Sequence, residues 1–214
     1  MKIRYLGHAS FLITTNNGTR IITDPYTIDA RIKHAPINET ADIVTISHEH
    51  SDHNNIASVK GNPQGIRGAG KWNIKGVEIQ GIAAFHDNAG GKSRGANTIF
   101  CITVDGIKVC HLGDLGHMLS DAQVAEMGKV NVLLTPMAGN YTLDAATATE
   151  LMNKLMPAVT VPMHYRNPKV DYPVATVDAF TSGKKNVIAS DGSELELEKG
   201  KLPKDEIVVL KPAL

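Results

Sequence analysis

The apolar residues of this chain fall in short runs separated by Gly, Pro and Asn, a pattern typical of β-strands joined by turns. In the first half, the strands that this pattern predicts are residues 2–6, 10–15, 19–23, 42–47, 72–74 and 77–85. Two more predicted strands, 98–104 and 107–112, flank Asp105-Gly106, a dipeptide typical of two-residue hairpin turns. The first half is therefore predicted to be mostly β-sheet.

The second half alternates short apolar strands with helical patterns. Ser120-Asp121-Ala122-Gln123 is a capping box that predicts the start of a short helix. In the clearest helical pattern, 144–155, Leu151, Met152 and Leu155 fall on one side. Further helices are predicted at 54–60 and 174–180, and further strands at 130–135, 159–161, 186–189, 194–197 and 207–210. This order fits an α/β (α+β) fold in which two mixed sheets pack face to face with helices outside.

Composition and charge predict one soluble domain over residues 1–214. The chain has 22 basic and 22 acidic residues and 42% hydrophobic residues, and no linker or charge block divides it. The zero net charge gives no reason to expect a nucleic-acid partner. Because no signal peptide and no apolar segment of membrane-spanning length is recognised, we expect a cytoplasmic protein with no membrane partner. Composition leaves open whether the chain forms a homo-oligomer.

The two cysteines lie in the strands on either side of Asp105-Gly106. Counting outward from a two-residue loop places Cys101 opposite Cys110, within reach of a cross-strand disulfide. Two reduced, buried thiols are the expectation for a cytosolic protein. The sequence does not decide between the two states.

The densest chemical motif is His48-Glu49-His50-Ser51-Asp52-His53, which directly follows the apolar strand 42–47. Imidazole and carboxylate are ligands that zinc and similar divalent ions prefer. Side chains this close in sequence cannot all reach one ion without strain, so we expect His48 and His50 to face one ion and Asp52 and His53 a neighbouring one. A polar turn that happens to be rich in histidine is the alternative.

Three more candidate ligands follow apolar strands: His86, Asp114 and His164. Taken singly, each is weak evidence, but groups at strand ends along one sheet edge can meet in one cleft. A two-metal site would then consist of His48, His50 and His86 around one ion and Asp52, His53 and His164 around the other, with Asp114 between them. His111, three residues before Asp114, could compete with His86.

These motifs resemble those of the metallo-β-lactamase-fold hydrolases. The resemblance rests on H-x-H-x-D-H after a strand, the Gly113-Asp114 turn and Pro162-Met163-His164-Tyr165. The opening residues 5–13 and Thr23-Asp24-Pro25 are similar to the ascorbate-6-phosphate lactonase-like branch. The resemblance implies a four-layer αββα sandwich and assigns the family's ligand positions to His48, His50, Asp52, His53, His86, Asp114 and His164. It favours His86 over His111.

Residues around the motif suggest a surrounding layer of the site. His8, Asp24 and His111 are candidates for contacting the ligands rather than the ions; Asp24 could orient an imidazole or simply form the turn before Pro25. His34 and His117 are expected to be solvated. The candidates for binding substrate are Tyr141, Tyr165 and Arg166, together with Lys92 and Arg94 in the Gly-rich loop 88–97. This loop is expected to be flexible, and its sequence does not fit a phosphate-binding Walker motif.

The resulting hypothesis is a hydrolase with two divalent ions, zinc being expected and manganese or iron compatible. A metal-bound hydroxide, oriented by Asp52, would attack a small ester, lactone or phosphoester. Two alternatives on the same fold are a diiron oxidoreductase and a nuclease or phosphodiesterase. The diiron relatives typically place Glu at the position of His50, and the transfer-RNA nucleases carry an RNA-binding insertion, which this neutral chain lacks. The sequence does not identify the substrate.

Overall fold

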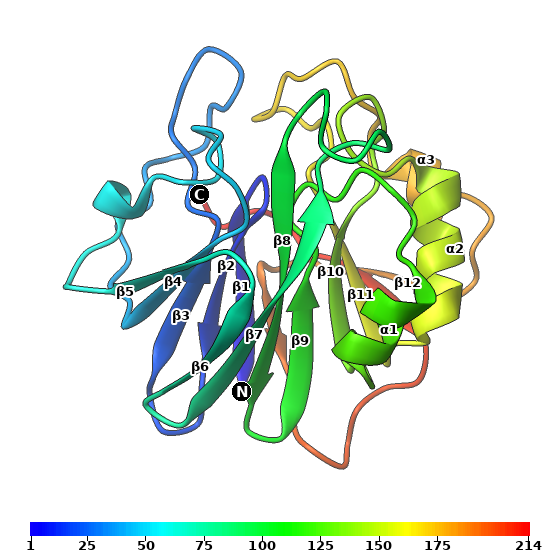
Figure 1. Ribbon diagram of the computed structural model, residues 1–214. Helices are drawn as coiled ribbons and strands as arrows, with labels where there is room; N and C mark the ends of the chain where they lie inside the picture. The colour runs from blue at the N-terminus through cyan, green and yellow to red at the C-terminus, as the bar shows by residue number, and fades with distance from the viewer.

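Two β-sheets pack face to face in the computed structural model, which describes residues 1–214 (Figure 1). The six-stranded sheet has the order β13 (Glu194–Glu196), β1 (Lys2–Gly7), β2 (Ser10–Thr14), β3 (Arg20–Thr23), β4 (Ile43–Ile46), β5 (Gln64–Arg67). The eight-stranded sheet has the order β12 (Val187–Ala189), β14 (Glu206–Val209), β11 (Val159–Met163), β10 (Val132–Pro136), β9 (Ile107–His111), β8 (Ala96–Val104), β7 (Val77–Phe85), β6 (Gly70–Ile74).

Both sheets are mixed, as the sequence predicts. In the six-stranded sheet, β3, β4 and β5 run parallel, whereas β13, β1, β2 and β3 pair antiparallel. In the eight-stranded sheet, the strands from β9 to β12 in the spatial order pair parallel, and β6 to β9 pair antiparallel. Parallel pairing matters for the site because it brings the carboxyl ends of neighbouring strands to one edge.

The main core lies between the two sheets. Val132 and Leu134 of β10 belong to this core, whereas Leu133 between them packs on the opposite face of the same sheet. Successive strand residues point to opposite faces, so a strand that is covered on both sides needs apolar residues at every position. This is why β10 and β4 are buried at every position and, apart from one threonine in each, apolar without alternation.

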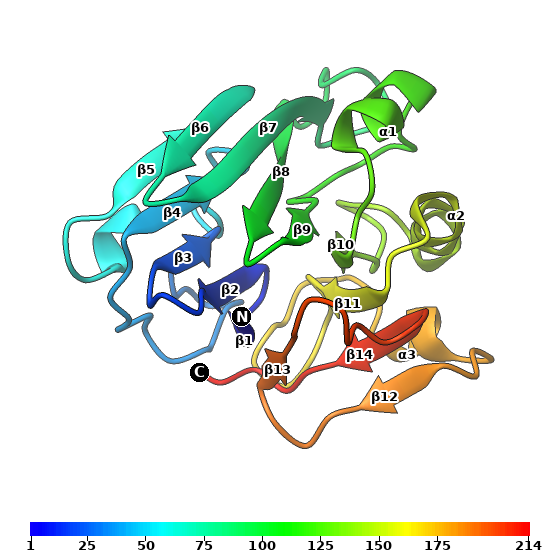
Figure 2. The ribbon, with the colours of Figure 1, turned by 90° about the horizontal axis from the view of Figure 1, so that it is seen from below.

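The two outer layers differ. Helices α1 (Asp121–Met127), α2 (Ala145–Leu155) and α3 (Asp178–Thr181) lie on the side of the eight-stranded sheet (Figure 2). The outer face of the six-stranded sheet is covered instead by the loop between β3 and β4, with Tyr26, Ile32 and Ile37 buried against Ile22 and Val44. The expected helix at 54–60 is only a short 3-10 helix, η1 (Ile56–Ser58).

Other boundaries also differ from the sequence predictions. The helix predicted at 174–180 is wrong except for its last turn, because Ala175 forms backbone hydrogen bonds to Ala138 and Arg166 and is held outside a helix. Strand β5 is missing from the predictions, since Ile66 is its only buried residue and leaves no apolar pattern.

The predicted hairpin and register are confirmed. Asp105 and Gly106 both have positive φ angles, 51° and 74°, as a type I′ turn requires. Cys101 lies opposite Cys110 in the β8–β9 pair, and both are free, buried thiols.

Asp144 caps the long helix α2, and its removal gives a simple stability prediction. The carboxylate accepts the backbone N–H of Thr147 at 2.8 Å, and this bond lowers the pKa of Asp144. We expect Asp144→Ala to lower the free energy of unfolding by about 1 kcal/mol at pH 7 and Asp144→Asn to cost much less, because Asn is also a good cap. A lowered folded-state pKa means that this contribution disappears in acid, so the Ala penalty measured by urea unfolding should shrink below about pH 4. An equal penalty at pH 3 and pH 7 would contradict it.

Candidate metal centre

The candidate residues meet at one edge of the two sheets, the upper edge in Figure 1. Each follows a strand that ends there. From the six-stranded sheet come His8 after β1, Asp24 after β3, and His48, His50, Asp52 and His53 after β4; from the eight-stranded sheet come His86 after β7, Asp114 after β9, and His164 after β11. The carboxyl ends of strands at such an edge are where ligand sites of α/β proteins are usually built.

The structure brings His48, His50 and His86 together as one group. Their ligand-type atoms all lie within 4.8 Å of one another. The Nε2 atom of His48 lies 3.1 Å from the Nδ1 atom of His50, although only two residues separate them. This is the set that the sequence predicts around one ion.

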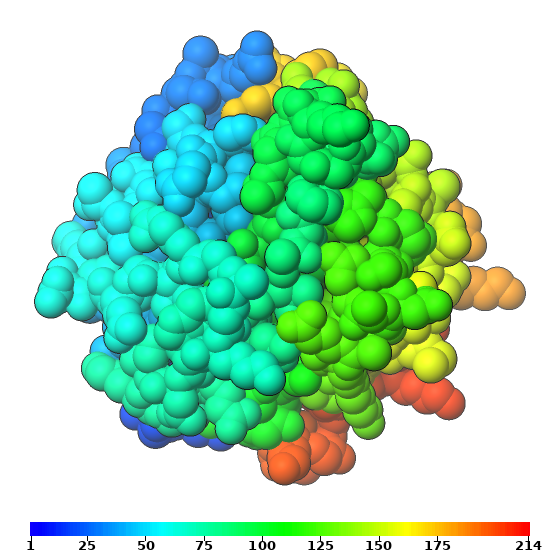
Figure 3. Space-filling view, in the orientation of Figure 1, coloured from blue at the N-terminus to red at the C-terminus, as the bar shows by residue number.

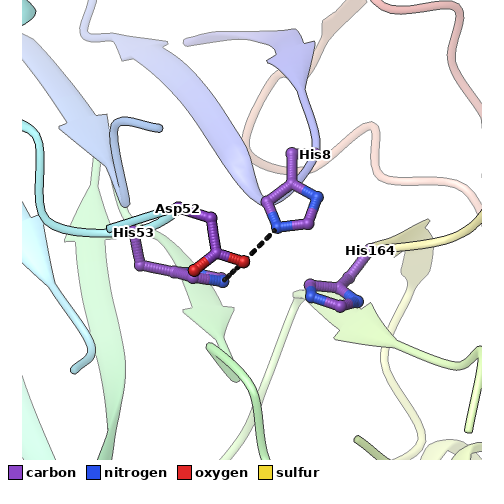
Figure 4. A group of neighbouring side chains, drawn as sticks. All are labelled: His8, Asp52, His53 and His164. Atoms are coloured by element: carbon purple, nitrogen blue, oxygen red, sulfur yellow. Dashed lines mark hydrogen bonds and ion pairs between the residues drawn. The ribbon is translucent and has the colours of Figure 1, made fainter. Parts of the chain in front are cut away.

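A second group contains Asp52, His53 and His164, with His8 as an additional member (Figure 4). The Nε2 atom of His8 lies 3.2 Å from Oδ2 of Asp52, and the ring centroids of His8 and His164 are 4.3 Å apart. His8 and His164 both adopt positive φ angles, 53° and 55°, and the His164 N–H donates to the His8 carbonyl oxygen at 2.9 Å. The two unusual backbones thus support each other across the sheets.

Asp114 lies between the two groups. Its Oδ2 atom is 3.2 Å from Nε2 of His86 and 3.3 Å from Nε2 of both His53 and His164. Its side chain is almost completely buried, with 3% exposed. A buried carboxylate surrounded by ring nitrogens of both groups has the position expected of a bridging ligand.

Asp24 fixes the orientation of two imidazoles. Its carboxylate accepts hydrogen bonds from the Ser47 N–H at 2.8 Å, from the Ser47 hydroxyl and from Nδ1–H of His53 at 2.9 Å. Because the Ser47 hydroxyl has only one proton to donate, its oxygen accepts from Nδ1–H of His48. The Nε2 atoms of His48 and His53 are thereby turned toward the centre, which is how carboxylates orient metal-binding imidazoles.

His111 is engaged elsewhere. Its Nε2 donates to the carbonyl oxygen of Ala9 at 2.7 Å, and its Nδ1 accepts the N–H of Gly113 at 3.2 Å. With both ring nitrogens occupied, His111 has no free lone pair to compete with His86.

Burial and neighbouring charges keep several of these groups in metal-competent forms. Burial, followed by the nearby His53, lowers the pKa of His48 to about 3, and burial with His164 lowers that of His8 to about 4. Burial alone would raise the pKa of Asp114, but His164 and His53 hold it well below its usual range. His53 differs: burial would lower its pKa, but Asp114 and Asp52 outweigh burial and raise it, so this ring favours a proton that a metal ion would have to displace. The centre thus attracts a cation strongly.

Unpaired polar atoms test whether a metal fits. Among the buried side-chain atoms without a hydrogen-bond partner are Nε2 of His53 and Oδ1 of Asp114. Leaving such atoms unpaired costs about 1–3 kcal/mol each, and a bound ion is one of the few ways to satisfy them in a folded protein. Imidazole and carboxylate are what zinc takes. The donor set therefore fits divalent metal ions.

A small cavity of about 180 Å³ opens above the centre. Its lining consists of His50, Asp52, His86, Asp114, His164, Tyr141, Tyr172, Arg31 and Arg94. Of the predicted substrate residues, Tyr141 and Arg94 line the cavity. Tyr165 is buried in the core instead, and Lys92 and Arg166 are exposed outside the lining. Arg31 and Tyr172 are not among the residues predicted from the sequence, because no motif marks them. Tyr172 donates its hydroxyl to Oδ2 of Asp52 at 3.2 Å.

Two loop histidines and one loop differ from expectation. His34 is buried rather than solvated, packed under Gly7 and bonded to the Leu214 carbonyl oxygen at 2.9 Å. His117 is half-buried and accepts the Phe85 N–H. The Gly-rich loop, expected to be flexible, is bound along its length to the carboxylate of Asp87. This carboxylate accepts four backbone N–H groups, those of Ala89, Gly91, Ser93 and Arg94, at 2.8–2.9 Å.

The two packed mixed sheets, with histidines and aspartates gathered at their strand ends, define a protein of the metallo-β-lactamase fold. The family model described as "Beta-lactamase superfamily domain" matches residues 2–164. The chain belongs to the metallo-β-lactamase superfamily.

Known relatives cover nearly the whole chain. A solved structure from Thermotoga maritima, described as a candidate Zn-dependent hydrolase of this superfamily, shares 38% identity with a TM-score of 0.82, over 98% of this chain and 97% of that one. A UPF0173 metal-dependent hydrolase of Carboxydothermus hydrogenoformans is 29% identical, covering 83% of this chain and 88% of its own. One from Thermococcus onnurineus is also 29% identical, covering 99% and 97%. No helix of this structure is long and apolar enough to cross a membrane.

Proposed function

We propose that this protein is a metal-dependent hydrolase that works with two divalent ions, zinc first among them. The observation that carries the proposal is the place of Asp114, whose buried carboxylate lies within 3.3 Å of ring nitrogens from both donor groups. The names of the relatives support hydrolysis as the reaction class.

Each residue of the centre has a proposed role. His48, His50 and His86 would hold one ion, Asp52, His53 and His164 the other, and Asp114 both. When bound, two such ions supply Lewis acidity and make water nucleophilic at neutral pH. The Asp24–Ser47 pair keeps the imidazole lone pairs pointing inward. Burial would raise the pKa of Asp52, but His53 and His8 hold it far below its usual value, so its carboxylate is ionised and available as a metal ligand and hydrogen-bond acceptor.

The substrate class that fits the cavity is a small ester, lactone or phosphoester. A volume of about 180 Å³ is smaller than a typical drug-sized site and has no room for a folded polymer. The similarity of residues 5–13 and 162–165 to the ascorbate-6-phosphate lactonase-like branch is part of the proposal. Tyr141, at the cavity wall, is in reach of such a substrate.

Metal analysis of protein purified without chelators or affinity tags that bind metal tests the proposal. We expect about two equivalents of zinc or manganese per chain. The variant His86→Ala should lose metal because it removes a ligand, and His111→Ala should retain it because both His111 nitrogens bond within the protein. Ester and lactone hydrolysis should disappear on metal removal and return on adding zinc.

The contrary outcomes are distinct. A folded protein that binds no added zinc would rule out the hydrolase. If every preparation contains iron and the protein reduces oxygen, the diiron oxidoreductase would be favoured over the hydrolase.

A further inference from the structure

We propose that the substrate carries, besides the bond to be cleaved, a negatively charged group, a carboxylate or a phosphate, which Arg31 and Arg94 bind at the mouth of the cavity. This inference rests on the proposed function, because it places the bond to be cleaved at the metal-facing end of the same small molecule. Five predicted metal ligands form the floor of that cavity, and the two guanidinium groups complete its wall.

The two arginines have no carboxylate partner inside the protein. Three other arginines are paired: Arg4 and Arg20 with Glu39, and Arg67 with Glu49. Neither Arg31 nor Arg94 forms an ion pair, although each lines a cavity that contains Asp52 and Asp114. The guanidinium groups of Arg31 and Arg94 are therefore available to an external anion. Guanidinium binds carboxylate and phosphate with two parallel hydrogen bonds.

Aromatic rings hold both guanidinium groups in place. Arg94 lies over the ring of Tyr141 at 4.5 Å from its centroid, and Arg31 lies over the ring of Tyr172 at 5.5 Å. The two tyrosines contact each other edge to face at 6.0 Å, so the four residues form one continuous row. A guanidinium on a ring face keeps its N–H edge free and has less conformational freedom to lose when it binds.

Backbone hydrogen bonds fix the two loops that carry the arginines. The Arg31 N–H donates to Oδ1 of Asp29 at 2.7 Å, and its carbonyl oxygen accepts the N–H of Asp171 at 2.9 Å. The Arg94 N–H donates to Oδ2 of Asp87 at 2.8 Å. Both arginines therefore extend from anchored loops, with Arg31 exposed and Arg94 half-buried.

The arginines approach from opposite halves of the molecule. Arg31 lies in the loop between β3 and β4, and Arg94 in the loop between β7 and β8. Figure 3 shows these loops, blue and green, at the upper rim of the molecule. A small acid bound between them would have one end at the metal centre and its charged end at the rim.

Equilibrium binding of three matched acids to the metal-loaded protein tests this inference. Butyrate, succinate and 3-phosphonopropionate share one carboxylate for the metal end and differ in the other end, which is apolar, a carboxylate or a phosphonate. We expect at least one dianion to bind about ten-fold more tightly than butyrate, the size of one charge-assisted contact. Arg31→Gln and Arg94→Gln should each remove most of that preference and leave butyrate binding unchanged.

Arg166→Gln is the matched control, because Arg166 is an unpaired arginine of the same edge that does not line the cavity. It should keep the preference. Metal content is measured on every sample, so failure of the hydrolase proposal is seen separately as absence of metal. Equal binding of all three acids to metal-loaded wild type, or an equal loss in Arg166→Gln, would overturn the inference. Which dianion binds more tightly identifies the charged group as carboxylate or phosphate.

Discussion

Replacing Asp114 with Asn is expected to abolish two-metal binding in a protein that still folds. Asn has nearly the same size as Asp, but it removes the negative charge that lies 3.2–3.3 Å from Nε2 of His53, His86 and His164. Two divalent ions in a buried site would then be opposed by fewer carboxylates, and no side chain would bridge the donor groups. Elemental analysis should show that the metal content of this variant falls from about two equivalents to one or none.

Asp24→Asn is the graded control for that experiment. Asp24 contacts His53 and Ser47 but does not face the cavity, so its loss should weaken metal binding by about 10–100-fold, as for other outer-shell carboxylates. Asp114→Asn should therefore be the more severe of the two in both metal affinity and hydrolysis. A variant of Asp114 that keeps two tightly bound ions would show that this carboxylate does not bridge them.

Gly113→Ala is expected to destabilise the protein strongly, lowering the free energy of unfolding by about 3 kcal/mol or more. Gly113 has a φ angle of +56°, and an added Cβ would lie 2.4 Å from Oδ1 of Asn97 and 2.5 Å from Cβ of Ser47. Asn97 holds the turn by accepting the Asp114 N–H and donating to the Leu112 carbonyl oxygen. The clash therefore acts on the residues that position Asp114 and His48.

Gly183→Ala separates the two causes of that loss. Gly183 also has a positive φ angle, +77°, but no atom lies within 4 Å of the position of its added Cβ. It should cost only the backbone term, about 1 kcal/mol. Urea unfolding of both variants in the presence of chelator, where metal binding makes no contribution, gives the comparison. Equal losses in the two variants would show that contacts of the added methyl group with Asn97 and Ser47 do not contribute to the destabilisation.

The predicted ligands could be found from sequence because each follows an apolar strand, and a strand end is a local signal. His48 to His53 follow β4, and His86 and His164 follow β7 and β11. What brings them together is strand pairing, which the sequence does not encode locally: β9, β10 and β11 are parallel neighbours, whereas β7 reaches the same edge through its antiparallel pairing with β8. The motif spacing predicted the split of ligands between two groups, and the structure places the members of each group within 4.8 Å.

Half of the cavity wall could not be predicted, because Arg31 and Tyr172 lie in loops without periodicity and away from any ligand in the sequence, whereas Tyr141 and Arg94 were predicted. Arg31 and Tyr172 are far apart in sequence and meet only because Ile32 and Val170 pair in an isolated β-bridge. Tyr165 and Arg166 follow His164 directly, and their neighbouring position suggested a shared role. The φ angle of +55° at His164 turns the chain, so that Tyr165 enters the core and Arg166 faces solvent.

The centre also joins the two halves of the sandwich. Asp52 and His53 belong to the six-stranded sheet, and His86, Asp114 and His164 to the eight-stranded sheet. In the proposed two-ion state, the ions therefore act as a removable cross-link between the sheets at their open edge. Anything that binds only the folded chain stabilises it by mass action. The free energy of unfolding would therefore rise with the concentration of free metal. The same few side chains would then determine both the rate of substrate cleavage and the stability of the folded protein.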